Sequence, residues 1–238
     1  REFVRQLSEA ERFDEIWLIS RRKDRMEELA GELHTKARVI PLDLTDSNSI
    51  RKYGILLDAA KPEVAVLVNA AGFGIFHKFT DCKPEDIYGM IDLNDKALVG
   101  MTYTSLPYMR AGGRIINLAS ASAFQPVPYI NVYAATKAFV ISFSRALNVE
   151  LQDRGISVLA VCPFWTKTEF FDRARDDDTI SYYSHYYTAE EVVTRALEDL
   201  ARGKDVSVCG AAVRGQRLLV KLLPHRTVMK IWCRQQKK

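Results

Sequence analysis

Short apolar runs alternate with longer amphipathic segments along the chain. Residues 64–68 are apolar at every position, as a strand buried on both faces of a parallel sheet requires. In residues 22–33, Met26, Leu29 and Leu33 instead recur at helical spacing and form one stripe. The same two patterns predict further strands at 16–19, 39–40, 114–118, 156–161 and 206–208, and helices at 86–109, 132–152 and 188–202.

Local polar residues mark where two of the predicted helices begin. Asp46 is placed to cap the helix that follows the strand at 39–40. Thr188 and Glu191 have the spacing of a capping box before the helix at 188–202. Strands that alternate with helices predict an α/β fold, a doubly wound parallel sheet with helices on both faces. In such sheets ligands bind at the carboxyl ends of the strands, so we expect functional residues there.

Length and composition limit the class of protein. The chain has 238 residues, 47% hydrophobic and 27% charged, which suits a single α/β domain over residues 1–238. No apolar run approaches the ~20 residues that a membrane-spanning helix needs. The four cysteines are scattered, without a nearby His partner, which argues against a zinc site and a disulfide framework. We expect a cytoplasmic protein with no metal.

Tyr133 and Lys137 are the first candidates for chemistry. Residues four apart lie on the same face of a helix, and an ammonium near a phenol favours the phenolate, which lowers the tyrosine pKa. A tyrosine tuned in this way can exchange a proton with an alcohol or a carbonyl. The spacing also occurs by chance in helices. Ser120 follows the strand at 114–118, where it could donate to the same substrate oxygen, or serve only as a turn residue.

Two further segments suggest a cofactor site. The small residues of Asn69-Ala70-Ala71-Gly72 follow the strand at 64–68 and would let the backbone approach a flat cofactor, although a simple glycine turn would look the same. Asn94 lies inside the helix predicted over 86–109, where asparagine is unfavourable, so a water-binding or kinking role would explain it.

In order and spacing, these residues resemble the short-chain dehydrogenase/reductase family. The resemblance covers residues 16–210 and also includes Asp43, after the family's third strand, with Pro163 and Thr168. Ser120 lies thirteen positions before Tyr133, as in the family's short, single-domain branch. The resemblance implies an enzyme that interconverts an alcohol and a ketone or aldehyde by hydride transfer. The alternative to an enzyme is a non-catalytic or regulatory dinucleotide-binding member of the same fold.

The resemblance also implies residue roles. Tyr133 would be the general acid/base, and Lys137 would lower its pKa and hold the nicotinamide ribose. Ser120 would orient the substrate oxygen, and Asn94 would fix a water that links Lys137 to solvent. The implied cofactor contacts are Asp43 and Leu44 for the adenine, Asn69, Ala70, Ala71 and Gly72 for the adenosine ribose, and Pro163 and Thr168 near the carboxamide or phosphates.

The end of the strand at 16–19 predicts the cofactor type. NAD enzymes usually place an acidic residue there, whereas this chain has Ser20 followed by Arg21 and Arg22. Two guanidinium groups would bind a 2′-phosphate, which predicts NADP(H) over NAD(H) with Arg21 as the main contact. The other interpretation is a solvated helix start.

The chain departs from the family pattern in three places. The opening strand and glycine-rich phosphate loop are missing, and residues 1–7 look like the helix that follows that loop. We therefore expect a truncated or incomplete form of an enzyme whose sheet lacks a central strand. Phe164 replaces the usual glycine after Pro163 and would narrow the pocket, and Ala70 replaces a frequent second asparagine.

The last two segments concern substrate and partners. Residues 169–187 are rich in Phe and Tyr, interrupted by Asp176, Asp177 and Asp178, and predict either a lid over a hydrophobic small-molecule carbonyl or alcohol substrate or aromatics packed on the core. The tail at 214–238 is basic and apolar and could touch a membrane surface, but a terminal helix packed near the active site or a subunit interface is the more common arrangement. We expect a homodimer or homotetramer and no nucleic-acid binding.

Overall fold

The computed structural model describes residues 1–174 and 179–238. Its strands are β1 (Ile16–Ser20), β2 (Ala37–Pro41), β3 (Val66–Asn69), β4 (Arg114–Leu118), β5 (Ser157–Val161) and β6 (Val206–Ser207). Its α-helices are α1 (Glu2–Ala10), α2 (Lys23–Gly31), α3 (Ser47–Ala60), α4 (Pro84–Ile91), α5 (Ala97–Ser105), α6 (Asn131–Glu150), α7 (Phe170–Ala174), α8 (Ala189–Ala201), α9 (Ala211–Leu222) and α10 (His225–Gln235). All strand pairs among these residues are parallel, which confirms the predicted α/β class.

The predicted helix starts are confirmed by their capping hydrogen bonds. The Asp46 carboxylate accepts a hydrogen bond from the Asn48 backbone N–H at 2.9 Å and caps α3. Thr188 and Glu191 form the reciprocal capping box of α8. These bonds satisfy backbone donors that have no partner inside the helix, and they fix where each helix begins.

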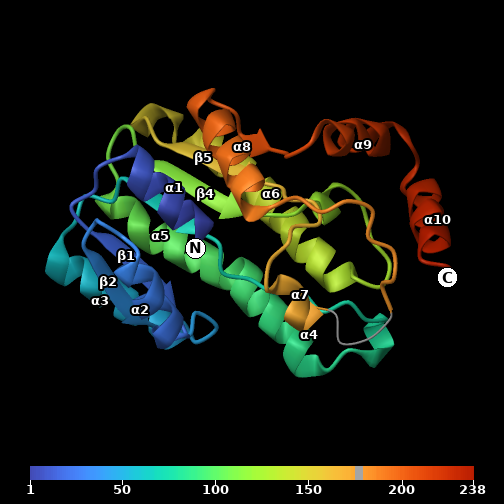
Figure 1. Ribbon diagram of the computed structural model, residues 1–238, viewed down its shortest axis with the longest axis horizontal. Coiled ribbons are helices and arrows are strands. Elements are labelled where there is room, and N and C mark those ends of the chain that lie inside the picture. Colours follow the sequence, from blue (N-terminus) through green and yellow to red (C-terminus); the bar gives the residue numbers. More distant parts are fainter. Residues whose placement is uncertain (175–178) are drawn as a thin grey trace.

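Alternate side chains of each strand enter different cores, because helices cover both faces of the sheet (Figure 1). In β1, Ile16 and Leu18 pack toward α2, whereas Trp17 and Ile19 pack toward α3. In β4, Ile116 joins the cluster beneath α1 and α8, and Ile115 joins the cluster on the opposite face. This two-sided burial explains why the strands are apolar at almost every position.

The sheet is divided in the middle of its strand order. β1 pairs with β2 in a two-stranded sheet, and β3, β4, β5 and β6 form a separate four-stranded sheet in that order. Residues of β1 and β3 line the same cleft between the two sheets.

The expectation of a single continuous helix over 86–109 is wrong in one respect. A π-helical turn, Asp92–Lys96, separates α4 from α5 and contains Asn94. Each π-turn adds a residue to the helical repeat and so rotates the side chains that follow. The sequence signal at Asn94 therefore marked a real departure from α-helical geometry.

A chain of buried amides and hydroxyls ties the strands to the helices below the cleft. Asn69 donates to Thr102 Oγ1 at 3.0 Å and to Asn117 Oδ1 at 2.8 Å, and Asn117 donates to Ser144 Oγ at 2.9 Å. The four residues come from β3, α5, β4 and α6. Buried polar groups that are fully paired in this way fix the relative positions of the elements that carry them.

The C-terminal helices α9 and α10 lie beside the end of the molecule that is far from β1 and β2 (Figure 1). Trp232 of α10 donates to the Pro128 carbonyl at 3.0 Å, which holds the helix to the loop before α6. Within the described ranges, no helix is both long enough and apolar enough to span a bilayer.

Candidate active site

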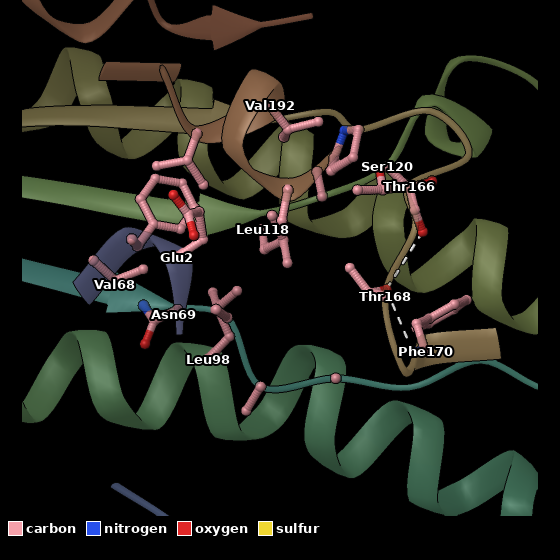
Figure 2. A pocket seen from close by; sticks show the side chains of 18 of the residues that line it. Glu2, Val68, Asn69, Leu98, Leu118, Ser120, Thr166, Thr168, Phe170 and Val192 are labelled. Carbon is pink, nitrogen blue, oxygen red and sulfur yellow. Dashed lines mark hydrogen bonds between the residues drawn. The ribbon is translucent and has the colours of Figure 1, made fainter. Parts of the chain in front are cut away.

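One cleft contains nearly all of the residues that the sequence singles out. It runs between β1 and β3 along their length and continues past the carboxyl ends of the strands, where the doubly wound topology places ligands. Figure 2 shows Asn69 at the end of β3, Ser120 beyond β4, and Thr168 and Phe170 on the facing segment. The predicted residues that line the cleft are Arg21, Arg22, Asp43, Leu44, Asn69, Ala70, Ala71, Gly72, Ser120, Tyr133, Lys137, Pro163 and Thr168.

Tyr133 and Lys137 lie on the buried stripe of α6, because residues four apart share a helix face. The Lys137 side chain is only 4% exposed, and its Nζ donates to the Leu118 carbonyl at 2.7 Å. The same Nζ lies 5.8 Å from the centroid of the Tyr133 ring. Ser120, just beyond β4, forms a side-chain hydrogen bond with Tyr133. The three side chains thus meet at the floor of the cleft.

The lowered tyrosine pKa expected from the Tyr–Lys spacing is wrong for this structure. Burial raises the pKa of Tyr133 to about 12, and the hydrogen bond with Ser120 only partly opposes this rise. Burial also lowers the pKa of Lys137 to about 8. Each shift has the same cause, because a low-dielectric environment disfavours the charged form of either group. At neutral pH Tyr133 is therefore a neutral phenol that can donate a proton.

Asn94 lies behind the cleft and does not line it. Its side chain is 1% exposed and has three partners: Oδ1 accepts from Phe73 N at 3.0 Å, and Nδ2 donates to Phe73 O at 2.9 Å and to Thr136 Oγ1 at 3.0 Å. These bonds join the π-helical turn to the loop after β3 and to α6. Asn94 thus holds the wall around Lys137 in place, and the water link to solvent stays a prediction.

Asp95 is a residue of this region that the sequence analysis missed. Its Oδ1 is buried without a hydrogen-bond partner, and burial raises the carboxyl pKa to about 7, against the attraction of Lys137. The negative charge of Asp95 in turn raises the pKa of Lys137. The two groups are therefore electrostatically coupled next to the proposed acid/base.

Two glycines let the loop after β3 pass close to the Tyr133 and Lys137 side chains. A Cβ at Gly72 would lie 2.8 Å from Asn94 Oδ1 and 3.3 Å from Lys137 Nζ. A Cβ at Gly74, which the sequence analysis did not single out, would lie 2.8 Å from Tyr133 Cδ2. Real Cβ atoms do not approach so closely, so these positions require glycine for packing against the site itself.

Guanidinium groups gather where the cleft reaches the end of β1. Arg21 lies 3.8 Å from the Asp43 carboxylate, and Arg22 lies 3.4 Å from that of Glu169. Arg25, which the sequence analysis missed, also pairs with Glu169. The hydrogen bonds that Asp43 accepts from Thr45 hold the pKa of its carboxyl below the usual value. This end of the cleft therefore carries a positive group suited to a phosphate.

Aromatic side chains cover the end of the cleft that contains Tyr133. The Phe170 ring lies 5.4 Å from the Tyr133 ring, and Phe76 lies 6.0 Å from each of them, centroid to centroid. Phe170 and Phe171 both pack on the core and line the cleft. That segment 169–187 acts as a lid over a substrate stays a prediction. Asp176, Asp177 and Asp178 lie outside the described residues.

The cleft brings groups suited to the two ends of a dinucleotide into one space. These groups are a cluster of arginines, small residues that expose the backbone, and the Tyr133, Lys137 and Ser120 side chains. A ligand with a phosphate-bearing end and a reactive end fits this arrangement.

Comparisons with known proteins agree with this geometry. The family model described as short chain dehydrogenase matches residues 1–179. Sulfoacetaldehyde reductase 2 of Chromohalobacter salexigens is 38% identical over 159 residues, 64% of this chain and 63% of that protein. The very-long-chain 3-oxoacyl-CoA reductase of Bos taurus is 35% identical over 170 residues, 67% of this chain and 54% of that protein. The matches thus span less than two thirds of these relatives.

A solved structure shares the fold over nearly the whole chain. It is a short-chain dehydrogenase from Sphingobium yanoikuyae in complex with NADPH, with a TM-score of 0.77 and 26% sequence identity. The superposition covers 96% of this chain and 90% of that chain.

Proposed function

The chain belongs to the short-chain dehydrogenase family, and from that premise we propose that the protein is an NADP-dependent oxidoreductase that interconverts an alcohol and a ketone or aldehyde. The observation that carries the proposal is that the buried Tyr133 and Lys137 and the half-buried Ser120 line the same cleft. The kinship with two reductases supports the reaction class. The bound NADPH of the Sphingobium protein supports the cofactor class.

The cofactor supplies the hydride, and the chain's own residues manage the substrate oxygen. Tyr133, neutral at pH 7, gives its phenolic proton to the carbonyl oxygen in reduction and takes it back in oxidation. Ser120 donates a hydrogen bond that orients the same oxygen. Lys137 holds a positive charge near the phenolate that forms, which stabilises it in a site that Phe170 and Phe76 shield from water.

The residues that would hold the cofactor surround the rest of the cleft. Arg21 and Arg22 would bind the 2′-phosphate, and Asp43 and Leu44 would contact the adenine. The remaining contacts would come from Asn69, Ala70, Ala71, Gly72, Pro163, Thr168 and Lys137. The aromatic cover favours a hydrophobic small-molecule substrate, since polar chains would lose hydration there without new partners.

The proposal also includes a homodimer or homotetramer in the cytoplasm. Tyr103, Phe139 and Val149 are large apolar side chains exposed on α5 and α6, and burial against a second copy would remove them from water.

A substrate screen of the full-length protein tests the reaction class. Ketones and aldehydes of increasing apolar size are mixed with protein and NADPH, and the loss of NADPH absorbance is followed. We expect turnover of an apolar or ring-bearing carbonyl compound. Tight NADPH binding, seen by fluorescence, together with no turnover of any compound would instead identify a non-catalytic dinucleotide-binding protein.

The arginine pair tests the cofactor preference. Replacement of both Arg21 and Arg22 by Ala is expected to lower kcat/KM for NADPH by about 10–100-fold, because charge-assisted contacts to the 2′-phosphate are lost. The value for NADH should change little. Lys23→Ala, an exposed change on the next residue, is the matched control. A wild-type preference for NADH, or an equal loss with both cofactors, would contradict the assignment.

A further inference from the structure

Helix α9 is apolar on the face that points away from the protein. Its buried residues are Val213 and Val220, which lie on one side of the helix because they are two turns apart. Leu218 and Leu222 are 64% and 82% exposed. At 100° per residue they lie on the opposite side, where they share one face at i,i+4 spacing. The helix therefore has a second apolar face in addition to the one that packs on the body.

The C-terminal segment that contains α9 and α10 carries basic residues and no acidic ones. Residues 206–238 contain no Asp or Glu, and Lys221 lies on α9 beside the leucines. On α10, Arg226, Lys230 and Arg234 are exposed and recur every four residues, so they form a stripe on one face. A helix pair with exposed leucines and a uniform positive charge fits a surface that is apolar inside and anionic outside.

Hydrogen bonds hold the C-terminal end of α10 to a segment beside the cleft. The Gln236 side chain, 1% exposed, accepts hydrogen bonds from Ser181 N and Tyr182 N, each at 3.0 Å. It also donates to Tyr182 O at 3.3 Å. Together with Trp232, which donates to Pro128 O at 3.0 Å, Gln236 fixes α10 to the body. Helix α9, which carries the leucines, is held separately by buried Val213 and by Arg214, which donates to the Val208 carbonyl at 3.2 Å. Both helices are thus fixed to the body of the protein.

We propose that α9 and α10 dock on an anionic lipid bilayer, with Leu218 and Leu222 inserted among the acyl chains and the basic side chains at the headgroups. The positive charge of α9 and α10 favours an anionic bilayer over a second copy of the chain as the binding partner. Two copies that met through this face would bring together segments without a single acidic residue, and like charges in contact repel. Anionic headgroups supply the complementary charge.

Vesicle co-sedimentation of the full-length protein tests the proposal. The probes are vesicles of phosphatidylcholine alone and of phosphatidylcholine mixed with phosphatidylglycerol. We expect sedimentation with the mixed vesicles only, and a loss of binding of about tenfold or more in Leu218→Ser/Leu222→Ser and in Lys221→Glu/Lys230→Glu. The matched controls are Ile55→Ser and Arg51→Glu/Lys52→Glu, which change exposed residues of α3 and should bind as the wild type does.

Three results would overturn the proposal. The first is a wild type that does not bind the mixed vesicles, and the second is binding that the leucine changes leave intact. The third is a leucine variant that elutes as a smaller species in gel filtration without vesicles, which would assign the face to a second copy. Thermal melting shows that each variant is folded. None of these readouts needs turnover, so their outcome is separate from that of the proposed reaction.

Discussion

Replacement of Tyr133 by Phe is expected to lower kcat by about 10²–10⁴-fold, the usual contribution of a positioned general acid. The phenyl ring keeps its contacts with Phe76 and Phe170, so the cleft should keep its shape. Only the hydroxyl is removed, and with it the proton for the substrate oxygen. NADPH binding should therefore change little while turnover is almost lost.

Steady-state kinetics and NADPH fluorescence titration together measure the effect of Tyr133→Phe. Tyr88→Phe is the matched control, because it removes the same hydroxyl from an exposed ring on α4. Turnover at the wild-type rate in the Tyr133 variant would refute the mechanism. A parallel loss of turnover and of cofactor affinity would show instead that Tyr133 acts mainly by packing.

The strands were predictable because helices cover both faces of the sheet. The apolar pair Ile115 and Ile116 in β4 and the apolar run 158–161 in β5 leave few alternatives to buried parallel strands, and β4 begins and ends as expected. The helix over 86–109 was harder to predict. Its apolar pattern continues without a proline until Pro107, while the π-helical turn depends on hydrogen bonds from Asn94 to Phe73 and Thr136, which are distant in sequence.

The same turn explains why Asp95 was missed. Regular α-helical spacing places Met90, Asn94, Ala97 and Leu98 on the inner face and leaves Asp95 to the side. The extra residue of the π-turn changes the direction of the side chains, and one carboxylate oxygen becomes buried. Arg25 was missed for a different reason, since its partner Glu169 is brought near only by the fold.

The direction of the Tyr133 pKa shift could not be judged from the Tyr–Lys spacing alone. Four residues on a helix place Lys137 beside the ring, but the size of the electrostatic effect depends on burial. Here both side chains are buried, and Lys137 directs its ammonium to the Leu118 carbonyl. The sequence predicts that Tyr133 and Lys137 lie close together. Which protonation state each of them favours depends on how deeply the two side chains are buried.

Replacement of Lys137 by Met is expected to abolish most activity and yet to stabilise the fold at neutral pH. Burial lowers the lysine pKa from 10.5 to about 8, which corresponds to a cost of about 3 kcal/mol for the buried charge at pH 7. Methionine fills a similar volume without that cost, but the Leu118 carbonyl loses a donor worth about 1 kcal/mol. The free energy of unfolding should therefore rise by about 2 kcal/mol.

The pH dependence gives this prediction its sign. Below pH 8 the lysine is protonated in both the folded and the unfolded protein, so the wild type bears the full cost of the buried charge. Between pH 8 and 10.5 the unfolded chain binds more protons than the folded one, and wild-type stability rises with pH. The advantage of Lys137→Met should thus be largest at pH 7 and fade by pH 10.5, as measured by urea unfolding. Lys52→Met, on the exposed side of α3, should show no such dependence. If Lys137→Met is less stable than the wild type at pH 7, the buried ammonium contributes more through its partners than its burial costs.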